Sequence, residues 1–245
     1  MGNNYSVTRF LLQKFTDRDA RDDNGKTPVD YAKDDPVFLW MFKHGPDLKS
    51  RNLKNQNTVL ISASTRGDIP AIQSLIAGGA AIEARNQRSN TALHEACIVG
   101  HLEVIKVLIS HGVNVNAKGT SGWSVLSHCV RANRKAAVRI LLENGDVDPE
   151  ATSELGPQTA LAEAVTLHHW SIAQLLIKHG ANVNVTDGQL QRFPILCLAA
   201  MHTKDTENAD MVRLLLDHGA DIEAASIGGW TALAGAVTDG ANLLG

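Results

Sequence analysis

The sequence has few of the residues that cross-link a chain or carry it through a membrane. It contains three cysteines, Cys97, Cys129 and Cys197, and no C-x-x-C pair. A small and odd number of cysteines favours buried thiols in a reducing compartment over a disulfide framework. The longest apolar runs, residues 37–42 and 194–201, are far shorter than the roughly 20 residues that cross a bilayer. We therefore expect no transmembrane segment.

The sequence also has no large excess of positive or negative charge. The formal net charge is -3, so a large basic surface for nucleic acid is not expected. Aromatic residues make up only 4% of the 245 residues, but apolar residues reach 44%, which is enough to bury a core.

No apolar segment follows a basic start, so no secretory signal is indicated. A cytoplasmic location is predicted, with the nucleus as an alternative.

The sequence repeats itself with a period near 33 residues. One marker is a glycine that ends an apolar helical run, and the other is a residue that opens the preceding segment. The glycines are Gly45, Gly79, Gly112, Gly145, Gly180 and Gly219, and the opening residues are Thr27, Thr58, Thr91, Ser124, Thr159, Pro194 and Thr231. Because two independent markers share one spacing, the chain consists of repeated supersecondary units.

One unit shows what each repeat builds. Thr91 is a good N-cap, because its hydroxyl can satisfy a free backbone N–H, and the apolar residues after it share one helical face. Gly100 breaks this first helix, a second helix follows over residues 101–111, and Gly112 ends it by taking a positive φ. Residues 113–122 predict an extended hairpin tip. Neither short helix can bury its face alone, so the units must stack.

This unit resembles the ankyrin repeat, whose pattern begins D-x-x-G-x-T-P-L-H-x-A and ends L-L-x-x-G-A-D-V-N. Residues 22–28 match the opening, residues 90–96 match the middle, and residues 175–184 and 214–223 match the close. The resemblance covers essentially the whole chain. It implies an all-α solenoid of stacked helix-turn-helix units joined by β-hairpin loops.

The chain departs from that pattern in places. Pro follows the opening Thr only at Pro28, and the His position is filled only by His94. The unit around residues 37–42 is about three residues short. A polar insertion at residues 204–209 separates the two helices of its unit, and it predicts a surface loop.

We predict a single domain over residues 1–245. It contains a partial unit at 1–21, units at about 22–52, 53–85, 86–118, 119–151, 152–186 and 187–225, and a partial unit at 226–245. Residues 7–14 match a second helix without its first, and residues 230–237 match a first helix without its second. Both terminal units are less polar than terminal repeats usually are, because they carry Phe10, Leu11 and Leu12 at one end and Leu233, Val237, Leu243 and Leu244 at the other. Two interpretations stay open, a fragment of a longer protein or degenerate half-repeats that act as caps.

No set of residues indicates catalysis. His44, His111, His179 and His218 precede the helix-ending glycines, where an imidazole can bond the last carbonyls of its helix. The three cysteines fall on inner-helix core positions, where a thiol packs as a small hydrophobe. The protein is therefore predicted not to be an enzyme, and no metal site or cofactor is predicted.

The resemblance implies that a partner binds the concave face, which hairpin tips and first helices form. The matching contact positions are Arg85, Arg88, Asn90, Ile98, Val99, Lys118, Trp123, Arg131, Gln158 and Trp230. An aromatic anchor flanked by arginine is a usual hot spot, which singles out Trp123. The basic residues around it suit an acidic or phosphorylated segment. The alternative is that Trp123 packs flat on the next hairpin and the charges are ordinary solvated tips.

We therefore predict a non-enzymatic scaffold for protein–protein interaction that acts as a monomer. One alternative is the recognition arm or a fragment of a larger enzyme, receptor or ubiquitin-ligase adaptor. Another is an ankyrin protein that binds a small molecule or catalyses a reaction. Residues 1–6 also fit the pattern M-G-x-x-x-[ST], which predicts N-myristoylation of Gly2. A single acyl chain binds membranes only marginally.

Overall fold

The computed structural model describes residues 23–24, 56–144, 146–153, 158–188, 192–201 and 206–241. The chain divides into two compact units, Met1–Asn114 and Val115–Gly245. The predictions for Gly2, for the helix at 7–14, for His44 and for most of residues 22–52 fall outside the described residues. The repeat boundaries within a single domain stay a prediction.

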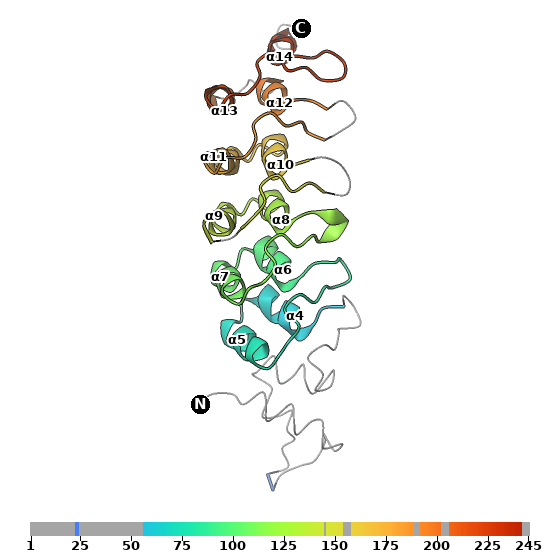
Figure 1. The fold of residues 1–245 in the computed structure, drawn as a ribbon, viewed down its shortest axis with the longest axis vertical. Helices are drawn as coiled ribbons and strands as arrows, with labels where there is room; N and C mark the ends of the chain where they lie inside the picture. Colours follow the sequence, from blue (N-terminus) through green and yellow to red (C-terminus); the bar gives the residue numbers. More distant parts are fainter. Residues whose placement is uncertain are drawn as a thin grey trace. The chain divides into compact units, whose positions relative to one another are not determined.

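The described part of the first unit contains two consecutive helix pairs. The first pair is α4 (Val59–Arg66) and α5 (Ile69–Ala77), and the second is α6 (Ala92–Val99) and α7 (Leu102–Ser110). The first helices of the pairs, α4 and α6, pack on each other, and so do the second helices, α5 and α7. The unit therefore has an inner layer of first helices and an outer layer of second helices (Figure 1).

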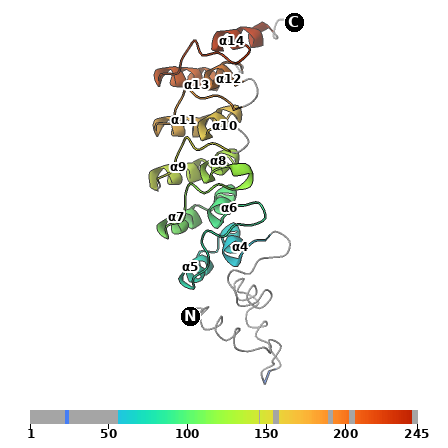
Figure 2. The same ribbon diagram turned by 45° about the vertical axis from the view of Figure 1, so that its right-hand side comes forward.

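The second unit repeats this arrangement. Its inner helices are α8 (Val125–Arg131), α10 (Ala160–Thr166), α12 (Ile195–Met201) and α14 (Ala232–Ala241), and its outer helices are α9 (Lys135–Asn144), α11 (Trp170–Lys178) and α13 (Thr206–Asp217). Each inner helix packs on the next inner helix, and each outer helix packs on the next outer helix. The loops between repeats project from the inner row on the side away from the outer row (Figures 1 and 2).

The inner helices begin where the sequence predicts. The hydroxyls of Thr58, Ser124 and Thr159 each accept a hydrogen bond from the backbone N–H three residues later, at 3.2 to 3.3 Å. Such caps stabilise a helix by about 1 kcal/mol each. At Thr91 the hydroxyl and the backbone N–H lie 2.9 and 3.2 Å from Nδ1 of His94, so an imidazole joins this cap.

The outer helices end on the predicted histidines. Nδ1 of His111, His179 and His218 donates to the carbonyl four residues earlier, at 2.8 to 2.9 Å. The glycine after each histidine has φ between +74° and +85°, a conformation that costs glycine little. The structural role predicted for these three histidines is confirmed.

The core lies between the two helix layers of each unit. One leucine position, two residues after each inner-helix cap, is almost fully buried at Leu60, Leu93, Leu126, Leu161 and Leu196. Cys97, Cys129 and Cys197 are free and buried, as predicted. Burial raises the pKa of the Cys197 thiol, which makes it a poor nucleophile.

The insertion at residues 204–209 is not a loop throughout, which corrects the prediction. Helix α13 begins at Thr206, so residues 206–209 extend the outer helix at its start. A threonine followed by an acidic residue suits the beginning of a helix, because the backbone N–H groups there are free and the dipole is positive. The extra residues therefore lengthen α13 to 12 residues, against nine in α11.

Polar side chains at one repeated loop position tie each loop to the next. In the second unit, Asn116 Nδ2 donates to the carbonyl of Asp146, and Asn116 Oδ1 accepts from the N–H of Asp148. Asn184 makes the same two bonds to Gly219 and Asp221. These bonds align the loops of neighbouring repeats as a ladder.

Candidate functional site

The ten predicted contact residues fall in both units. The first unit holds Arg85, Arg88, Asn90, Ile98 and Val99, and the second holds Lys118, Trp123, Arg131, Gln158 and Trp230. In each unit they lie on the loops or on the ends of inner helices. The structure places them within repeats as the pattern predicts, and their role in binding stays a prediction.

The loop before α6 holds three of these residues in a fixed shape. Nη1 of Arg85 donates to the carbonyl of Ser89 at 2.9 Å, and Oδ1 of Asn86 accepts from the N–H groups of Arg88 and Asn90. Asn90 is buried and its amide donates to Oε1 of Glu95 at 3.0 Å. Asn90 therefore shapes the loop, while Arg85 and Arg88 are exposed.

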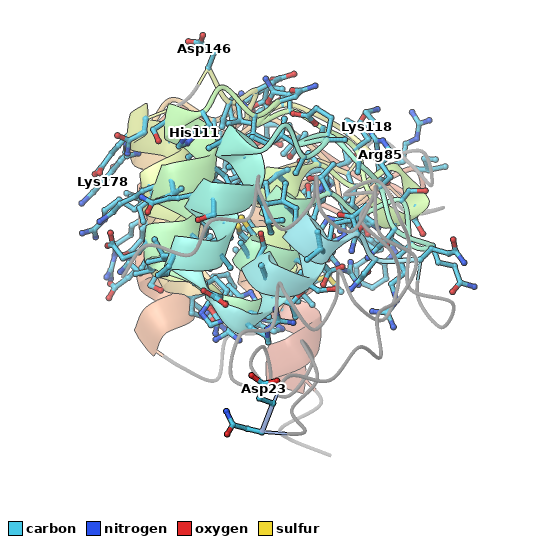
Figure 3. All side chains as sticks on the ribbon, turned by 90° about the horizontal axis from the view of Figure 1, so that it is seen from below. Asp23, Arg85, His111, Lys118, Asp146 and Lys178 are labelled. Atoms are coloured by element: carbon cyan, nitrogen blue, oxygen red, sulfur yellow. The ribbon has the colours of Figure 1, made fainter. Side chains whose placement is uncertain are left out.

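The hairpin before α8 positions Lys118 and Trp123. Lys118 and Ser124 form an antiparallel bridge, and the N–H of Gly119 donates to the carbonyl of Trp123 at 2.8 Å. The hairpin turns through a short 3-10 segment, Thr120–Gly122. Lys118 is exposed, whereas only 9% of Trp123 is exposed. Figure 3 shows Lys118 on the loop side of its unit and Lys178 on the outer-helix side.

Trp123 and Arg131 come together, and Glu163 joins them. The guanidinium carbon of Arg131 lies 4.9 Å from the centre of the Trp123 ring, which is a cation–π contact. Nη1 of Arg131 also forms an ion pair with Oε1 of Glu163. We call Trp123, Arg131 and Glu163 the Arg131 cluster. The side chain of Arg131 stays 48% exposed, while that of Glu163 is 3% exposed.

Burial dominates the electrostatics of Glu163. Desolvation raises its pKa above the ordinary glutamate value, although the nearby charges of Arg131 and His169 act in the opposite direction. Oε2 of Glu163 is buried and has no hydrogen-bond partner among the described residues. His169 is itself fixed, because its Nδ1 donates to the carbonyl of Val130 at 2.9 Å.

Sequence reasoning missed Glu163, although a signal was present. Arg131 lies seven residues after the cap Ser124, and Glu163 lies four residues after the cap Thr159. The same pair of positions meets again between Met201 of α12 and Gly235 of α14. An arginine at the first position and a glutamate at the second, one repeat apart, therefore predicts an ion pair across the repeat boundary.

Gln158 and Trp230 occupy loops that pack tightly. A Cβ added to Gly188 would lie 2.9 Å from the backbone nitrogen of Gln158, so the next loop lies directly against Gln158. Trp230 is partly exposed, and its carbonyl accepts a bond from the Ser226 N–H and one from the Cys197 thiol. Their backbones are thus held in place by the neighbouring loop and helix.

The described residues show no metal-binding group. Nowhere among them do three His, Cys, Asp or Glu side chains converge as metal ligands would. None of the described helices combines the length and hydropathy that a membrane span requires.

A family model for ankyrin repeats, built from three copies, matches residues 32–119, 59–153 and 118–187, and a single-repeat model matches residues 193–227. The chain belongs to the ankyrin repeat family. The predicted all-α ankyrin solenoid is therefore confirmed. Ankyrin repeats generally mediate protein–protein interaction and are typically non-catalytic.

Two solved ankyrin structures resemble this chain. One is the ankyrin repeat domain of Bcl-3, a member of the IkappaB protein family, with 28% identity and a TM-score of 0.67 over 78% of this chain and 83% of that one. The other is an ankyrin repeat domain from Acinetobacter baumannii, with 29% identity and a TM-score of 0.67 over 75% of this chain and 92% of that one. A comparison with curated proteins finds no match.

Proposed function

We propose that the chain is a non-enzymatic protein–protein interaction scaffold whose second unit binds an acidic or phosphorylated segment on its hairpin and inner-helix face. The Arg131 cluster carries this proposal. It holds a half-exposed guanidinium in one orientation, between an aromatic ring and a buried carboxylate. A fixed guanidinium loses little conformational entropy on binding.

The chemistry of arginine supports an anionic partner. A guanidinium has five N–H donors in a planar fork, and one nitrogen of Arg131 contacts Glu163. The remaining donors can bind a carboxylate or phosphate in a bidentate manner. Glu163 offsets much of the charge of Arg131, and Lys118 in the adjoining hairpin adds a further positive charge to this face.

Trp123 then acts as a platform for Arg131. With 9% of its surface exposed, it offers a partner little area of its own. Its ring instead fixes the plane of the guanidinium. This arrangement favours recognition through charge and hydrogen bonds over insertion of an aromatic anchor.

A peptide-binding experiment tests the proposal. Short acidic peptides, the same peptides with phosphoserine, and neutral peptides of matched length are titrated against the wild type, Lys118→Glu and the double variant Arg131→Gln/Glu163→Gln. The double variant removes both charges of the pair and so avoids a lone buried carboxylate. Lys178→Glu is the matched control, since it makes the same charge change on the outer-helix side (Figure 3).

We expect the anionic peptides to bind the wild type best. Lys118→Glu and the double variant should each weaken that binding about tenfold, which corresponds to about 1.4 kcal/mol. Lys178→Glu should leave it unchanged. Equal weakening by Lys178→Glu, or no preference for anionic peptides, would contradict the proposal.

A further inference from the structure

The inner helices of the second unit share one repeated pair of positions, four and seven residues after the cap. The N–H at the fourth position donates to the carbonyl of the cap in each of α8, α10, α12 and α14, at 3.0 to 3.2 Å. The helices therefore begin in the same register, and they stack in one row (Figure 1). The fourth positions hold His128, Glu163, Leu198 and Gly235, and the seventh positions of α8, α10 and α12 hold Arg131, Thr166 and Met201.

Two contacts show that these positions meet between neighbouring helices. Arg131 of α8 forms its ion pair with Glu163 of α10, which is a seventh position against a fourth. A Cβ added to Gly235 of α14 would lie 2.7 Å from Cγ of Met201 in α12, so Met201 points towards the same position of the next helix. Arg131 and Met201 therefore lie on the same face of the inner row, two repeats apart.

The charged and the apolar residues of this face are separated from each other. Within α8, α10 and α12, only Arg131 and Glu163 carry a full charge, and Glu163 is buried. Helix α12 consists of apolar residues, of which Leu198 and Met201 are partly exposed. Leu167, the C-cap of α10, is 38% exposed. The face thus offers a guanidinium at α8 and an apolar surface at α10 and α12.

Leu167 is held close to Arg131 by contacts on both sides of it. Its N–H donates to the carbonyl of Glu163 at 3.0 Å, so it lies one helical turn after the residue that pairs with Arg131. Two residues further on, Nδ1 of His169 donates to the carbonyl of Val130 at 2.9 Å. These contacts fix the end of α10 against the end of α8. Leu167 therefore connects the charged part of the face to its apolar part.

We call Arg131, Leu167, Leu198 and Met201 the inner strip, and we propose that it recognises a partner segment with an anionic residue at one end and large apolar side chains at the other. The proposal rests on the proposed function and adds the class of partner. The anionic group binds Arg131, and the apolar side chains cover the other three residues. Methionine suits such a surface, because its flexible side chain adapts to different partners.

The stacking of the helices sets the spacing within the segment. Packed helices lie about 8 to 10 Å apart, so the apolar part of the strip lies about 10 to 20 Å from Arg131 along the row. An extended chain advances about 3.3 Å per residue. The apolar residues of the segment should therefore lie about three to six residues from the anionic one.

Labelled peptides of glycine and serine, about 10 residues long, test the proposal. One carries a phosphoserine followed by leucines about three and six residues later, and another carries the same residues in the reverse order. Both orders are needed, because an extended segment can run either way along the strip. Each leucine peptide has a matched peptide in which alanine replaces the leucines.

Fluorescence anisotropy measures binding of each peptide to the full chain. In at least one order, we expect the leucine peptide to bind at least about tenfold more tightly than its alanine counterpart, because the leucines bury apolar surface. Leu167→Ala and Met201→Thr should each weaken the leucine peptide about fivefold and leave the alanine peptide unchanged. The repeats already accept both replacements, since Ala132 and Thr166 occupy the same positions in other repeats.

Two further variants serve as controls. Ile222→Ala changes an exposed apolar residue in the loop after α13 and should have no effect on either peptide. Arg131→Gln/Glu163→Gln should weaken the leucine and alanine peptides by the same factor, because it acts on the anionic end that both share. Circular dichroism confirms that each variant keeps the helical content of the wild type.

Equal binding by the leucine and alanine peptides in both orders would overturn the proposal. So would equal weakening of both peptides by Leu167→Ala and Met201→Thr, or an effect of Ile222→Ala as large as theirs. In any of these cases, weaker binding of the alanine peptide to Lys118→Glu would still support the proposed function. Absence of binding by every peptide would contradict both.

Discussion

Helices α10 and α14 carry the same pattern of residues but differ in what surrounds them. Leu161 and Val165 are core residues, whereas Leu233 and Val237 face outward. Nothing within the two helices explains the difference, since both begin with Thr, Ala and Leu. It comes from the outer helix that packs on α10. In a repeat protein, therefore, the neighbouring elements decide whether a position belongs to the core.

The largest effect on stability should come from the leucine that lies two residues after the cap of an inner helix. Leu161→Ala is expected to lower the free energy of unfolding by about 2 to 5 kcal/mol, because it leaves a cavity in a packed core. Leu233→Ala should change it by no more than about 0.5 kcal/mol, as surface substitutions usually do. Urea unfolding followed by circular dichroism measures both. Similar losses for the two variants would remove the distinction between these helices.

The opposite face of α14 should behave like an interior helix. A Cβ at Gly235 would lie 2.7 Å from Cγ of Met201 in α12, so Gly235→Leu must displace Met201. We expect a loss of about 1 to 3 kcal/mol in the same unfolding experiment. If Gly235→Leu is as mild as Leu233→Ala, then α14 does not pack closely on α12.

The loop ladder should show the same contrast on a smaller scale. Asn184→Ala removes two hydrogen bonds to the next loop and should cost about 1 kcal/mol, since both bonds are exposed. Glu223→Ala removes no such bond among the described residues and should cost less than about 0.5 kcal/mol. Thermal unfolding of both variants gives the comparison. A larger cost for Glu223→Ala would mean that its carboxylate already has a partner.

The smallest effect that we expect is a change in how the free energy of unfolding depends on pH, because Glu163 can bind a proton. Because burial raises its pKa in the folded chain, the fold binds this proton more tightly than the unfolded chain does. The contribution of Glu163 to stability is therefore most favourable at low pH and falls as pH rises from the ordinary glutamate pKa through the raised one. Glu163→Gln should gain stability relative to the wild type across that window.

Urea unfolding of the two proteins at a series of pH values checks this sign. The groups that face Glu163 are Arg131, which keeps its charge throughout, and His169. Their attraction is weaker than the desolvation of the carboxylate. A difference between the two proteins that shrinks as pH rises would show that the ion pair dominates instead.

The sequence predicted the repeats well because their signals are local. The caps at Thr58 and Thr159, and the histidines that bond the last carbonyls of the outer helices, lie within a few residues of the groups they satisfy. The insertion was misjudged because a polar segment fits a helix start as well as a loop. Only the structure shows that α13 begins at Thr206.

The candidate site was predicted less completely because its contacts cross repeat boundaries. Trp123 fits the pattern of an exposed anchor, but in the structure it is 9% exposed and Arg131 lies over its ring. Arg131 in turn forms an ion pair with Glu163, which lies in the next repeat. Likewise, the repeat pattern that makes Leu233 resemble a core residue does not show whether another helix covers it.

A thiol-labelling experiment tests the contrast between covered and open positions most directly. Cys97 occupies in α6 the position that Val237 occupies in α14, six residues after the cap, and it is 0% exposed. The wild type should therefore resist a thiol reagent under native conditions, since all three cysteines are buried. In Val237→Cys one thiol should react as fast as a free cysteine. If that thiol were as protected as Cys97, the face of α14 that carries Leu233 and Val237 would be covered and the account would be wrong.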